Sequence, residues 1–470
     1  MEQKDKQEII GKKNKVLCHL VKHQKKYLIL LLLIIWSIPL LTNLANNEPI
    51  IKGAESYYHL SQAKDITINN FYYWPLNFLS TNFPDQSLIL IPLILAISSI
   101  ILFVAITKKT NFTEKSTFFY LSLTVISPAF IWTFTTISAY SVQIFLTLLG
   151  LYFLSRDKQS IKILSLVPFI LATFFDTFSS LVLISLLLVY WFYKRKDAVI
   201  VKTILGATII LTTINSLLLR LPFMLGPFHR QEFVSELITD LGGLSGISLF
   251  TILIGLIGFT ITWKKKGFYF AYLLLPVVLI PYFLNTNTII YLSLLTTFFA
   301  TVGLTKLFER NWRIVSLKKI TFFILILGLL FSTLTYVERI AEYQPTEEII
   351  ETLSWVNQNL PNQEKVFSTP KNGYFIKYFT NKEPLYYIHQ ATLEKEDLLQ
   401  NISQSFYVTE LFPLLEENNI SIIYVTKDMK EQLSEEIGLL FLLKNERFKI
   451  VHSHEDTEVW VFVPSATEEE

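Results

Sequence analysis

The chain has 470 residues, of which 51% are hydrophobic and only 17% are charged, whereas soluble domains average about 25% charged residues. This composition argues against a soluble globular protein. The net charge of +2 hides two unlike parts, because residues 337–470 carry 24 acidic and 11 basic side chains, a net of −13, and residues 1–336 a net of +15. The single cysteine, Cys18, excludes an intramolecular disulfide and a cysteine-based zinc or iron–sulfur centre.

Long apolar runs recur along the chain up to about position 336 and then stop. A helix needs about 20 apolar residues to cross the hydrocarbon core of a bilayer. The first run follows eight lysines in residues 1–26 and is too long for a signal-peptide core, so we interpret it as a retained anchor. About eleven transmembrane helices are predicted, beginning near residues 27, 87, 117, 138, 163, 177, 198, 247, 268, 288 and 320.

The loops between these runs are alternately basic and poor in cations. Because Lys and Arg stay on the cytoplasmic side, the basic loops predict a cytoplasmic N-terminus. The loops 46–86 and 219–246 then face outside, and an odd number of crossings places residues 337–470 outside as well. The basic clusters are Lys108-Lys109, Arg156 with Lys158, Lys194-Arg195-Lys196, Lys264-Lys265-Lys266 and the cations between Arg310 and Lys319.

These patterns predict three parts: a basic cytoplasmic N-terminus (1–26), a multi-pass transmembrane domain (27–336) and an acidic extracytoplasmic domain (337–470). In the third part, apolar residues at helical spacing predict an amphipathic helix over 347–359. Short apolar runs at 365–367, 420–425 and 459–463 predict strands. The expected fold is therefore a polytopic α-helical membrane protein with a C-terminal mixed α/β domain.

The first outer loop contains the segment Gly53-Ala54-Glu55-Ser56-Tyr57-Tyr58-His59-Leu60. A carboxylate at a membrane surface can act as a general base or hold a divalent ion. Glu55 is accordingly a candidate catalytic residue, although the same pattern also suits a solvated loop acid. Phosphate-loop, dinucleotide-binding, zinc-protease and serine-hydrolase motifs do not occur, and no nucleic-acid role is indicated.

Two further outer segments carry ionisable residues. His229 and Arg230 precede Glu236, and the planar guanidinium of Arg suits a phosphate; ordinary ion pairs on a surface helix are the alternative. Asp176 lies between two apolar runs at the predicted outer boundary. It is either a substrate-facing acid or the N-cap of the next helix.

Several of these segments resemble motifs of the catalytic subunits of archaeal oligosaccharyltransferases. Glu55 to Leu60 is similar to the first-loop motif of that family, in which an acid precedes two aromatics and His. Val234-Ser235-Glu236 resembles its Ser-Val-Ser-Glu signature, and Ser127-Pro128-Ala129-Phe130 its Ser-Pro-Gly-Phe stretch. The tail segment 353–375 is similar to the opening of the family's soluble domain. The resemblance implies a GT-C membrane glycosyltransferase that uses a polyprenyl-linked sugar donor.

By the same resemblance, the family's catalytic acids and metal ligands fall on Glu55 and Glu236, with Mn²⁺ or Mg²⁺ as the implied ion. The chain also departs from the family, which has thirteen crossings and an Arg in the first-loop motif where this chain has Ser61. The segment 137–141, Ile-Ser-Ala-Tyr-Ser, lacks the family's Asp-x-Asp metal pair, and Thr369-Pro370-Lys371 stands where the family has Trp-Trp-Asp to bind the acceptor. Two metal ligands and the family's acceptor contact are therefore missing.

The hypothesis that follows is a glycosyltransferase with a changed acceptor, protein or glycan, acting at the outer face of the cell membrane. Glu55 would be the general base, while Arg230 and His229 would neutralise the leaving lipid phosphate. Tyr57, Tyr58, His59 and Asp176 would contact the substrate. The alternatives are a divergent oligosaccharyltransferase acting on protein Asn, a non-catalytic GT-C paralogue that scaffolds a complex, and a lipid transporter. Transporters usually carry ionisable residues within the membrane, and this chain has few of them.

Overall fold

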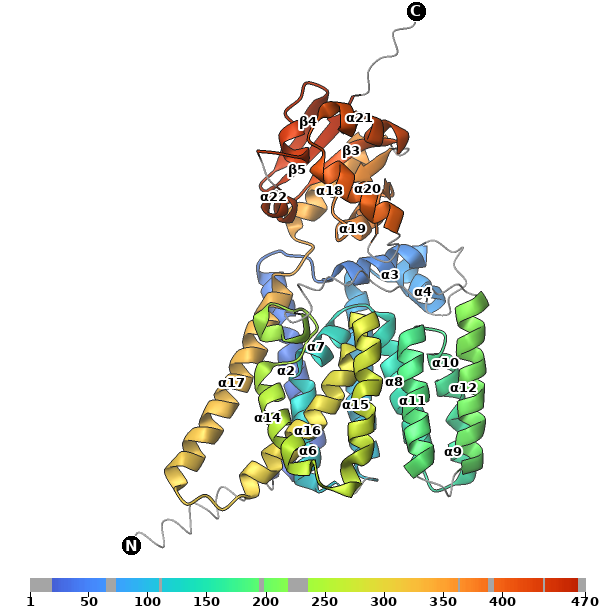
Figure 1. The fold of residues 1–470 in the computed structure, drawn as a ribbon, viewed down its shortest axis with the longest axis vertical. Helices are drawn as coiled ribbons and strands as arrows, with labels where there is room; N and C mark the ends of the chain where they lie inside the picture. Colours follow the sequence, from blue (N-terminus) through green and yellow to red (C-terminus); the bar gives the residue numbers. More distant parts are fainter. Residues whose placement is uncertain are drawn as a thin grey trace, which may run out of the picture.

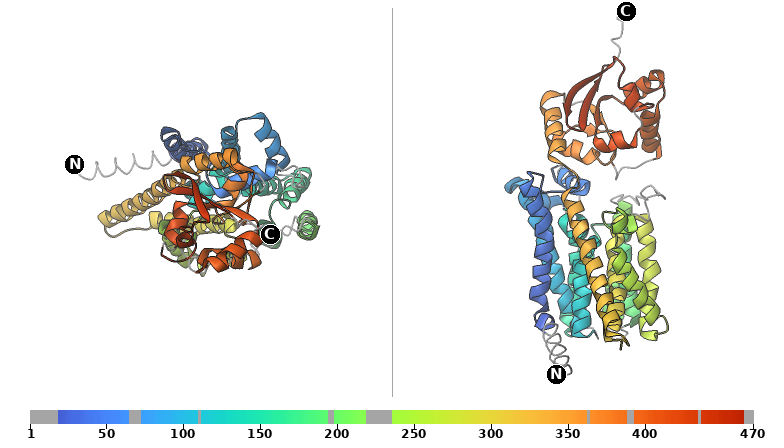
Figure 2. Two further views of the ribbon diagram at one scale, coloured as in Figure 1. Left: turned by 90° about the horizontal axis from the view of Figure 1, so that it is seen from above. Right: turned by 90° about the vertical axis from the view of Figure 1, so that its left-hand side faces the viewer.

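A computed structural model describes residues 19–64, 73–109, 112–193, 198–218, 236–361, 364–387, 393–433 and 436–463 of the chain. It has two layers: a bundle of long helices, and an α/β layer placed on one end of that bundle (Figure 1 and Figure 2). We call the bundle end that faces the α/β layer the tail-side end, and the opposite end the far end.

The bundle is built from the predicted apolar runs, since each of the eleven runs coincides with a helix or a broken helix. Its helices are α2 (Gln24–Ala45), α5 (Leu90–Thr107, preceded by η1, Asp85–Ile89), α6 (Glu114–Val125), α7 (Pro128–Thr135), α8 (Ala139–Leu154), α9 (Gln159–Leu164), α10 (Leu166–Ala172), α11 (Thr177–Tyr193), α12 (Ala198–Leu218), α14 (Leu249–Thr262), α15 (Tyr269–Leu284, preceded by η4, Lys266–Phe268), α16 (Ile289–Glu309, preceded by η5, Thr286–Thr288) and α17 (Val315–Ala341).

Six helices in the described part of the chain are long and apolar enough to cross a membrane, or seven if the bent pair α6 and α7 counts as one span. Four more apolar segments, 139–154, 159–172, 177–192 and 249–262, form shorter helices. The predicted membrane-protein class is confirmed, whereas the predicted number of about eleven crossings stays a prediction.

The bend between α6 and α7 follows from Ser127-Pro128. Proline cannot continue a helix but suits the first helical position. Here Pro128 opens α7, and the Ser127 hydroxyl caps it by accepting the backbone N–H of Phe130 at 3.3 Å. The two helices meet at 58° as a result.

Small residues allow α14 and α16 to pack closely. A Cβ atom on Gly258 would lie 1.9 Å from the carbonyl oxygen of Phe299, and one on Gly303 would lie 2.4 Å from that of Ile254. Glycine is therefore required at both positions for the two backbones to approach, as is common between membrane helices.

Two shorter helices, α3 (Ala54–Lys64) and α4 (Tyr73–Asn82), lie at the tail-side end between the bundle and the α/β layer. Both belong to the predicted outer loop 46–86. From the other predicted outer loop, 219–246, the structure describes residues 236–246 with the short helix η3 (Thr239–Leu241).

The α/β layer contains a five-stranded mixed sheet in the order β2-β1-β3-β5-β4. The strand β1 pairs in parallel with β2 and β3, while β5 pairs antiparallel with β3 and β4. The predicted helix and strands are present as α18, β1, β3 and β5. The elements are α18 (Glu347–Asn359), β1 (Lys365–Phe367), α19 (Gly373–Thr380), β2 (Glu383–Pro384), α20 (Leu393–Gln404), α21 (Val408–Glu417), β3 (Ile420–Val425), α22 (Lys427–Gln432), α23 (Leu439–Leu442), β4 (Phe448–His454) and β5 (Thr457–Phe462).

One hydrophobic cluster joins the first outer loop to the α/β layer. Tyr57 and Leu60 of α3 share it with Leu353 of α18 and Phe375 of α19. The helix α17 also runs through the predicted boundary at 336 and ends only at Ala341. The two layers are thus connected by a packed core as well as by the chain.

Candidate functional site

The local sequence places Glu55 at the start of α3, facing the bundle. Gly53 precedes it with a φ of +88°, a backbone conformation that glycine adopts without strain. Its N–H donates to the carbonyl of Gln344 at 2.9 Å, which ties the start of α3 to the segment after α17. The buried hydroxyl of Ser56 donates to the Lys52 carbonyl at 2.7 Å and accepts the N–H of Ile137 at 3.0 Å. These bonds hold α3 against the chain between α7 and α8.

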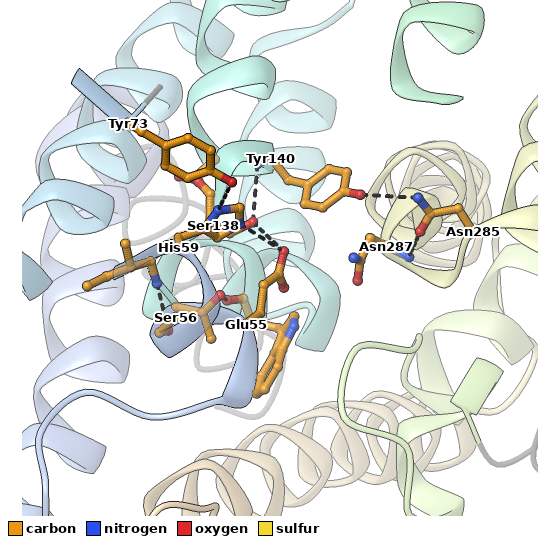
Figure 3. Close-up of polar contacts among 12 residues, drawn as sticks. Glu55, Ser56, His59, Tyr73, Ser138, Tyr140, Asn285 and Asn287 are labelled. Atoms are coloured by element: carbon orange, nitrogen blue, oxygen red, sulfur yellow. Dashed lines mark hydrogen bonds and ion pairs between the residues drawn. The ribbon is translucent and has the colours of Figure 1, made fainter. Parts of the chain in front are cut away.

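The Glu55 carboxylate accepts a hydrogen bond of 2.9 Å from the hydroxyl of Ser138 (Figure 3). Ser138 is also the N-cap of α8, where its oxygen accepts the N–H of Tyr140 at 3.2 Å. The Ser138 hydroxyl therefore plays both roles: its oxygen accepts from Tyr140 while its proton is donated to the carboxylate. The Glu55 side chain is 13% exposed, so the carboxylate is largely buried yet reachable.

His59 lies one helical turn after Glu55, on the same face of α3. Its Nε2 is 3.7 Å from Oε1 of Glu55, and its Nδ1 is 3.2 Å from the hydroxyl of Tyr73 in α4. With the proton on Nε2, Tyr73 donates to Nδ1 and the N–H faces the carboxylate. The distance between Nε2 of His59 and Oε1 of Glu55 is longer than a hydrogen bond. The interaction of His59 with Glu55 is therefore electrostatic.

A small pocket opens beside the Glu55 carboxylate. Its opposite wall includes Tyr140 of α8 and Asn287 of η5, and the Tyr140 hydroxyl accepts a hydrogen bond of 3.1 Å from Asn285. Figure 3 shows these side chains across from Glu55. The lining residues are Glu55, Trp132, Thr133, Thr136, Ser138, Tyr140, Ser245, Asn287 and Ile289.

Asp176 caps the helix α11. Its carboxylate accepts the N–H of Ser179 at 2.6 Å, as an N-cap does. Burial raises the pKa of Asp176 and the charge of Glu55 raises it further, while hydrogen bonds from Ser179 and Tyr140 oppose the rise. The capping alternative is therefore present in the structure, and the interactions with Tyr140 and Glu55 place Asp176 beside the pocket.

Tyr57 and Tyr58 point toward the α/β layer. Tyr57 is 4% exposed; its ring packs on Phe375 and Tyr378 at 5.3 and 5.1 Å, and its hydroxyl donates to the Ile51 carbonyl at 3.1 Å. The Tyr58 ring lies 4.8 Å from that of Tyr374, and burial raises the pKa of Tyr58. Neither tyrosine lines the pocket.

The second group of predicted site residues is only partly described. His229 and Arg230 lie outside the described residues. Glu236 is described: its carbonyl oxygen lies against Gly246, where a Cβ atom would approach to 2.3 Å, and its charge acts on Tyr282 of α15. Glu236 is thus near the pocket residue Ser245.

The described residues do not fit a divalent-metal site built by the protein. No group of three or more His, Cys, Asp or Glu side chains comes together in this part of the chain, and hard divalent ions take about six oxygen ligands. Glu55 is engaged by Ser138 and His59, and Asp176 by the end of α11.

Sequence reasoning did not single out Ser138, Tyr140, Asn285 and Asn287, which the structure brings together near Glu55. Ser138 and Tyr140 lie in the segment 137–141, which lacks the family's Asp-x-Asp pair, and no motif of the sequence includes the two asparagines. One signal was present: both segments lie at ends of apolar runs that the charge pattern assigns to the same side as Glu55.

No family model and no curated protein sequence matches the chain. Solved structures do resemble it. The oligosaccharyltransferase of Archaeoglobus fulgidus, tethered to an acceptor peptide containing the NVT sequon, aligns with a TM-score of 0.60 at 11% identity, over 93% of this chain and 75% of the other. ArnT of Cupriavidus metallidurans bound to undecaprenyl phosphate aligns with a TM-score of 0.51 at 11% identity, over 94% of this chain and 98% of the other.

A third structure, the Archaeoglobus fulgidus oligosaccharyltransferase with an inhibitory peptide and a dolichol-phosphate, aligns with a TM-score of 0.50 at 12% identity, over 95% of this chain and 75% of the other. These likenesses establish the fold. The predicted resemblance to a GT-C membrane glycosyltransferase, divergent in sequence, is confirmed at that level.

Proposed function

We propose that the chain is a membrane glycosyltransferase that transfers a sugar from a polyprenyl-phosphate-linked donor to an acceptor at the outer face of the membrane. One observation carries the proposal: on a GT-C fold, a mostly buried carboxylate, Glu55, accepts a hydrogen bond from Ser138 and lies 3.7 Å from His59 at the mouth of a small pocket. Two structures of similar fold contain a polyprenyl phosphate, which supports a lipid-linked donor.

In the proposed reaction Glu55 is the general base. Its carboxylate takes the proton of the acceptor hydroxyl as that oxygen bonds to the anomeric carbon, and the bond from the anomeric carbon to the phosphate oxygen breaks. The lipid phosphate leaves with the electron pair, and Glu55 then releases its proton to water. Ser138 orients the carboxylate, and the Asn287 and Tyr140 side chains face the space where the sugar would bind.

The leaving phosphate needs a cation near it. We propose that Arg230 and His229 supply that positive charge. Glu236 lies six residues after Arg230 in the same segment. The reaction as proposed needs no tightly held Mn²⁺ or Mg²⁺. Transfer by the purified protein is accordingly expected to change less than about twofold when a chelator is added, whereas loss of transfer that Mn²⁺ restores would contradict this.

We further propose eleven crossings, with the N-terminus cytoplasmic and the α/β layer extracytoplasmic. The basic connections α5–α6, α8–α9, α14–α15 and α16–α17 all lie at the far end of the bundle (Figure 1). Since cations concentrate on the cytoplasmic side, the far end is the cytoplasmic one. The pocket and the α/β layer then share the outer side.

The deciding experiment is transfer of labelled sugar from an extracted polyprenyl-linked donor pool by purified protein in detergent. Glu55→Gln keeps the size of the side chain but cannot accept the proton, and we expect transfer to fall about 100-fold or more. Glu114→Gln, at an exposed position in the first turn of α6, is the matched control and should transfer normally.

Unchanged transfer by Glu55→Gln would remove Glu55 from the mechanism. The acceptor class is read from the same assay, because transfer to an Asn-x-Ser/Thr peptide would indicate a divergent oligosaccharyltransferase. Binding of the donor without transfer to any acceptor would favour a non-catalytic paralogue.

A further inference from the structure

The helix α4 exposes large aromatic side chains. Trp74 is 70% exposed, Phe78 is 64% exposed, and Phe83, just after the helix, is 52% exposed. Trp74 and Phe78 are four residues apart and therefore lie on one face of the helix. Exposing so much aromatic surface to water is unfavourable. These side chains are therefore expected to lie in an apolar or interfacial environment.

The opposite face of α4 is firmly packed, so the exposed face is set by the fold. Tyr73 and Leu76 are buried, and the Tyr73 hydroxyl contacts His59 of α3. The side-chain amide of Asn77 donates to the carbonyl of Ala63, also in α3. A rotation of α4 that hid Trp74 and Phe78 would break these contacts.

The position of α4 along the chain fixes its height relative to the membrane. The helix ends at Asn82, and the candidate membrane span Asp85–Thr107 begins three residues later. Three residues reach at most about 10 Å, while the headgroup layer on each side of the hydrocarbon core is about 5 to 8 Å thick. The end of α4 is therefore at or near the headgroup layer, consistent with its place at the tail-side end of the bundle (Figure 1).

The candidate membrane span that follows α4 also exposes apolar side chains near its start. Leu90 and Ile94, in the first turns of α5, are 49% and 61% exposed. Residues 73–84 contain no charged side chain. Among the described residues, the charged side chains that flank this segment are Lys64 and Asp85, and both are engaged by Tyr378 of the α/β layer.

We propose that α4 is an interfacial membrane helix that inserts Trp74, Phe78 and Phe83 into the outer leaflet at headgroup level. Aromatic rings are favoured at this depth because they are apolar and polarisable, and Trp also carries a polar N–H. The partner of this surface is the lipid bilayer. The proposal depends on the fold and on membrane insertion, and its assignment to the outer leaflet rests on the proposed orientation of the bundle; it does not depend on the proposed transferase activity.

The test is depth-dependent fluorescence quenching in vesicles. In a Cys18→Ser background, Trp74→Cys and Phe78→Cys are each labelled with bimane, and the full-length protein is reconstituted into phosphatidylcholine vesicles with or without lipid spin-labelled near the headgroup. We expect the spin label to quench roughly half or more of the emission at both positions, as interfacial insertion requires. Iodide in the water should quench it little.

Two labelled variants calibrate the measurement. Ile94→Cys, on the lipid face of α5, should be quenched by the lipid label, and Phe406→Cys, equally exposed but in the α/β layer, should be quenched only by iodide. Emission at Trp74→Cys and Phe78→Cys that follows the pattern of Phe406→Cys would overturn the proposal. All four substitutions are at exposed side chains, so folding should be retained.

Discussion

The double role of the Ser138 hydroxyl makes it the residue on which the orientation of Glu55 depends. Ser138→Ala removes the donor to the carboxylate, and we expect kcat for sugar transfer to fall about 10- to 100-fold with little change in KM, since a hydrogen bond to a charged group contributes about 1.5–3 kcal/mol. The same change removes the cap of α8, which costs about 1 kcal/mol of stability. Melting temperature is therefore measured beside the kinetics.

Ser138→Thr separates the two effects because it keeps the hydroxyl. We expect it to restore most of the transfer rate. If Ser138→Ala loses stability but transfers sugar at the normal rate, the bond to Glu55 has no catalytic role.

The buried carboxyl of Asp176 predicts a pH-dependent stability. Its pKa is raised above the reference value of 3.8, mainly by burial and further by the charge of Glu55. Stabilisation of the fold by the protonated form is thus complete below pH 3.8 and is lost as the pH rises through the folded-state pKa. Melting temperature should fall over that range in the wild type.

Asp176→Asn should flatten this decline, because Asn caps a helix as well as Asp does but does not ionise. Asp157→Asn, at a side chain that is 89% exposed, is the control and should keep the wild-type profile. Parallel profiles for Asp176→Asn and the wild type would show that Asp176 does not titrate in the measured range.

Single residues of the site differ in how far sequence alone could find them. Glu55 is singled out by the resemblance of the segment Glu55 to Leu60 to the oligosaccharyltransferase first-loop motif, because the pattern alone also suits a solvated loop acid. Asn287 and Tyr140 were not, because polar side chains occur at most helix ends, and their meeting across the pocket depends on how α8 and α16 pack. The same limit applies to Tyr57, which packs on the α/β layer although the sequence suggested a sugar contact.

At the scale of elements, the contact between α3 and α19 holds the helix that carries Glu55. Tyr57 fills this contact, and Tyr57→Ala is expected to cost about 3–5 kcal/mol, as for other large aromatic truncations in a core. Tyr57→Phe loses only the bond to the Ile51 carbonyl and should cost about 1 kcal/mol. Thermal unfolding and the rate of proteolysis of the α/β layer measure both effects.

A different outcome for Tyr57→Phe would restore the sequence-based interpretation. If this variant unfolds normally but no longer transfers sugar, its hydroxyl acts on the substrate and not only on the Ile51 carbonyl. Normal transfer with a small loss of stability would assign Tyr57 to the interface.

The elements themselves were largely readable from the sequence. Runs of apolar residues mark the bundle helices because lipid imposes length and composition on them, and helix α18 was marked by its amphipathic spacing. The strand β4 was not predicted, since the segment Phe448–His454 contains Lys449 and two histidines, and four of its side chains are exposed. The packing of α3 on α19 joins segments about 300 residues apart, and no local pattern encodes such a contact.

At the scale of the whole molecule, charge and position agree. The acidic α/β layer and the pocket lie at one end of the bundle, and the basic connections lie at the other. Because the cytoplasmic leaflet is anionic, it attracts the basic end and repels the acidic layer. Both effects favour the same orientation of the molecule.

This orientation predicts the sidedness of chemical labelling. In a Cys18→Ser background, Asp456→Cys places a thiol on the α/β layer and Lys265→Cys places one at the far end, both at exposed positions. A membrane-impermeant maleimide added to intact cells should label Asp456→Cys fully and Lys265→Cys only after permeabilisation. The reverse pattern would put the pocket in the cytoplasm, and the sugar donor would then have to be presented on the inner leaflet. Labelling of both without permeabilisation would mean that the two positions lie on the same side of the membrane. The three proposed crossings between them, α15, α16 and α17, do not allow this.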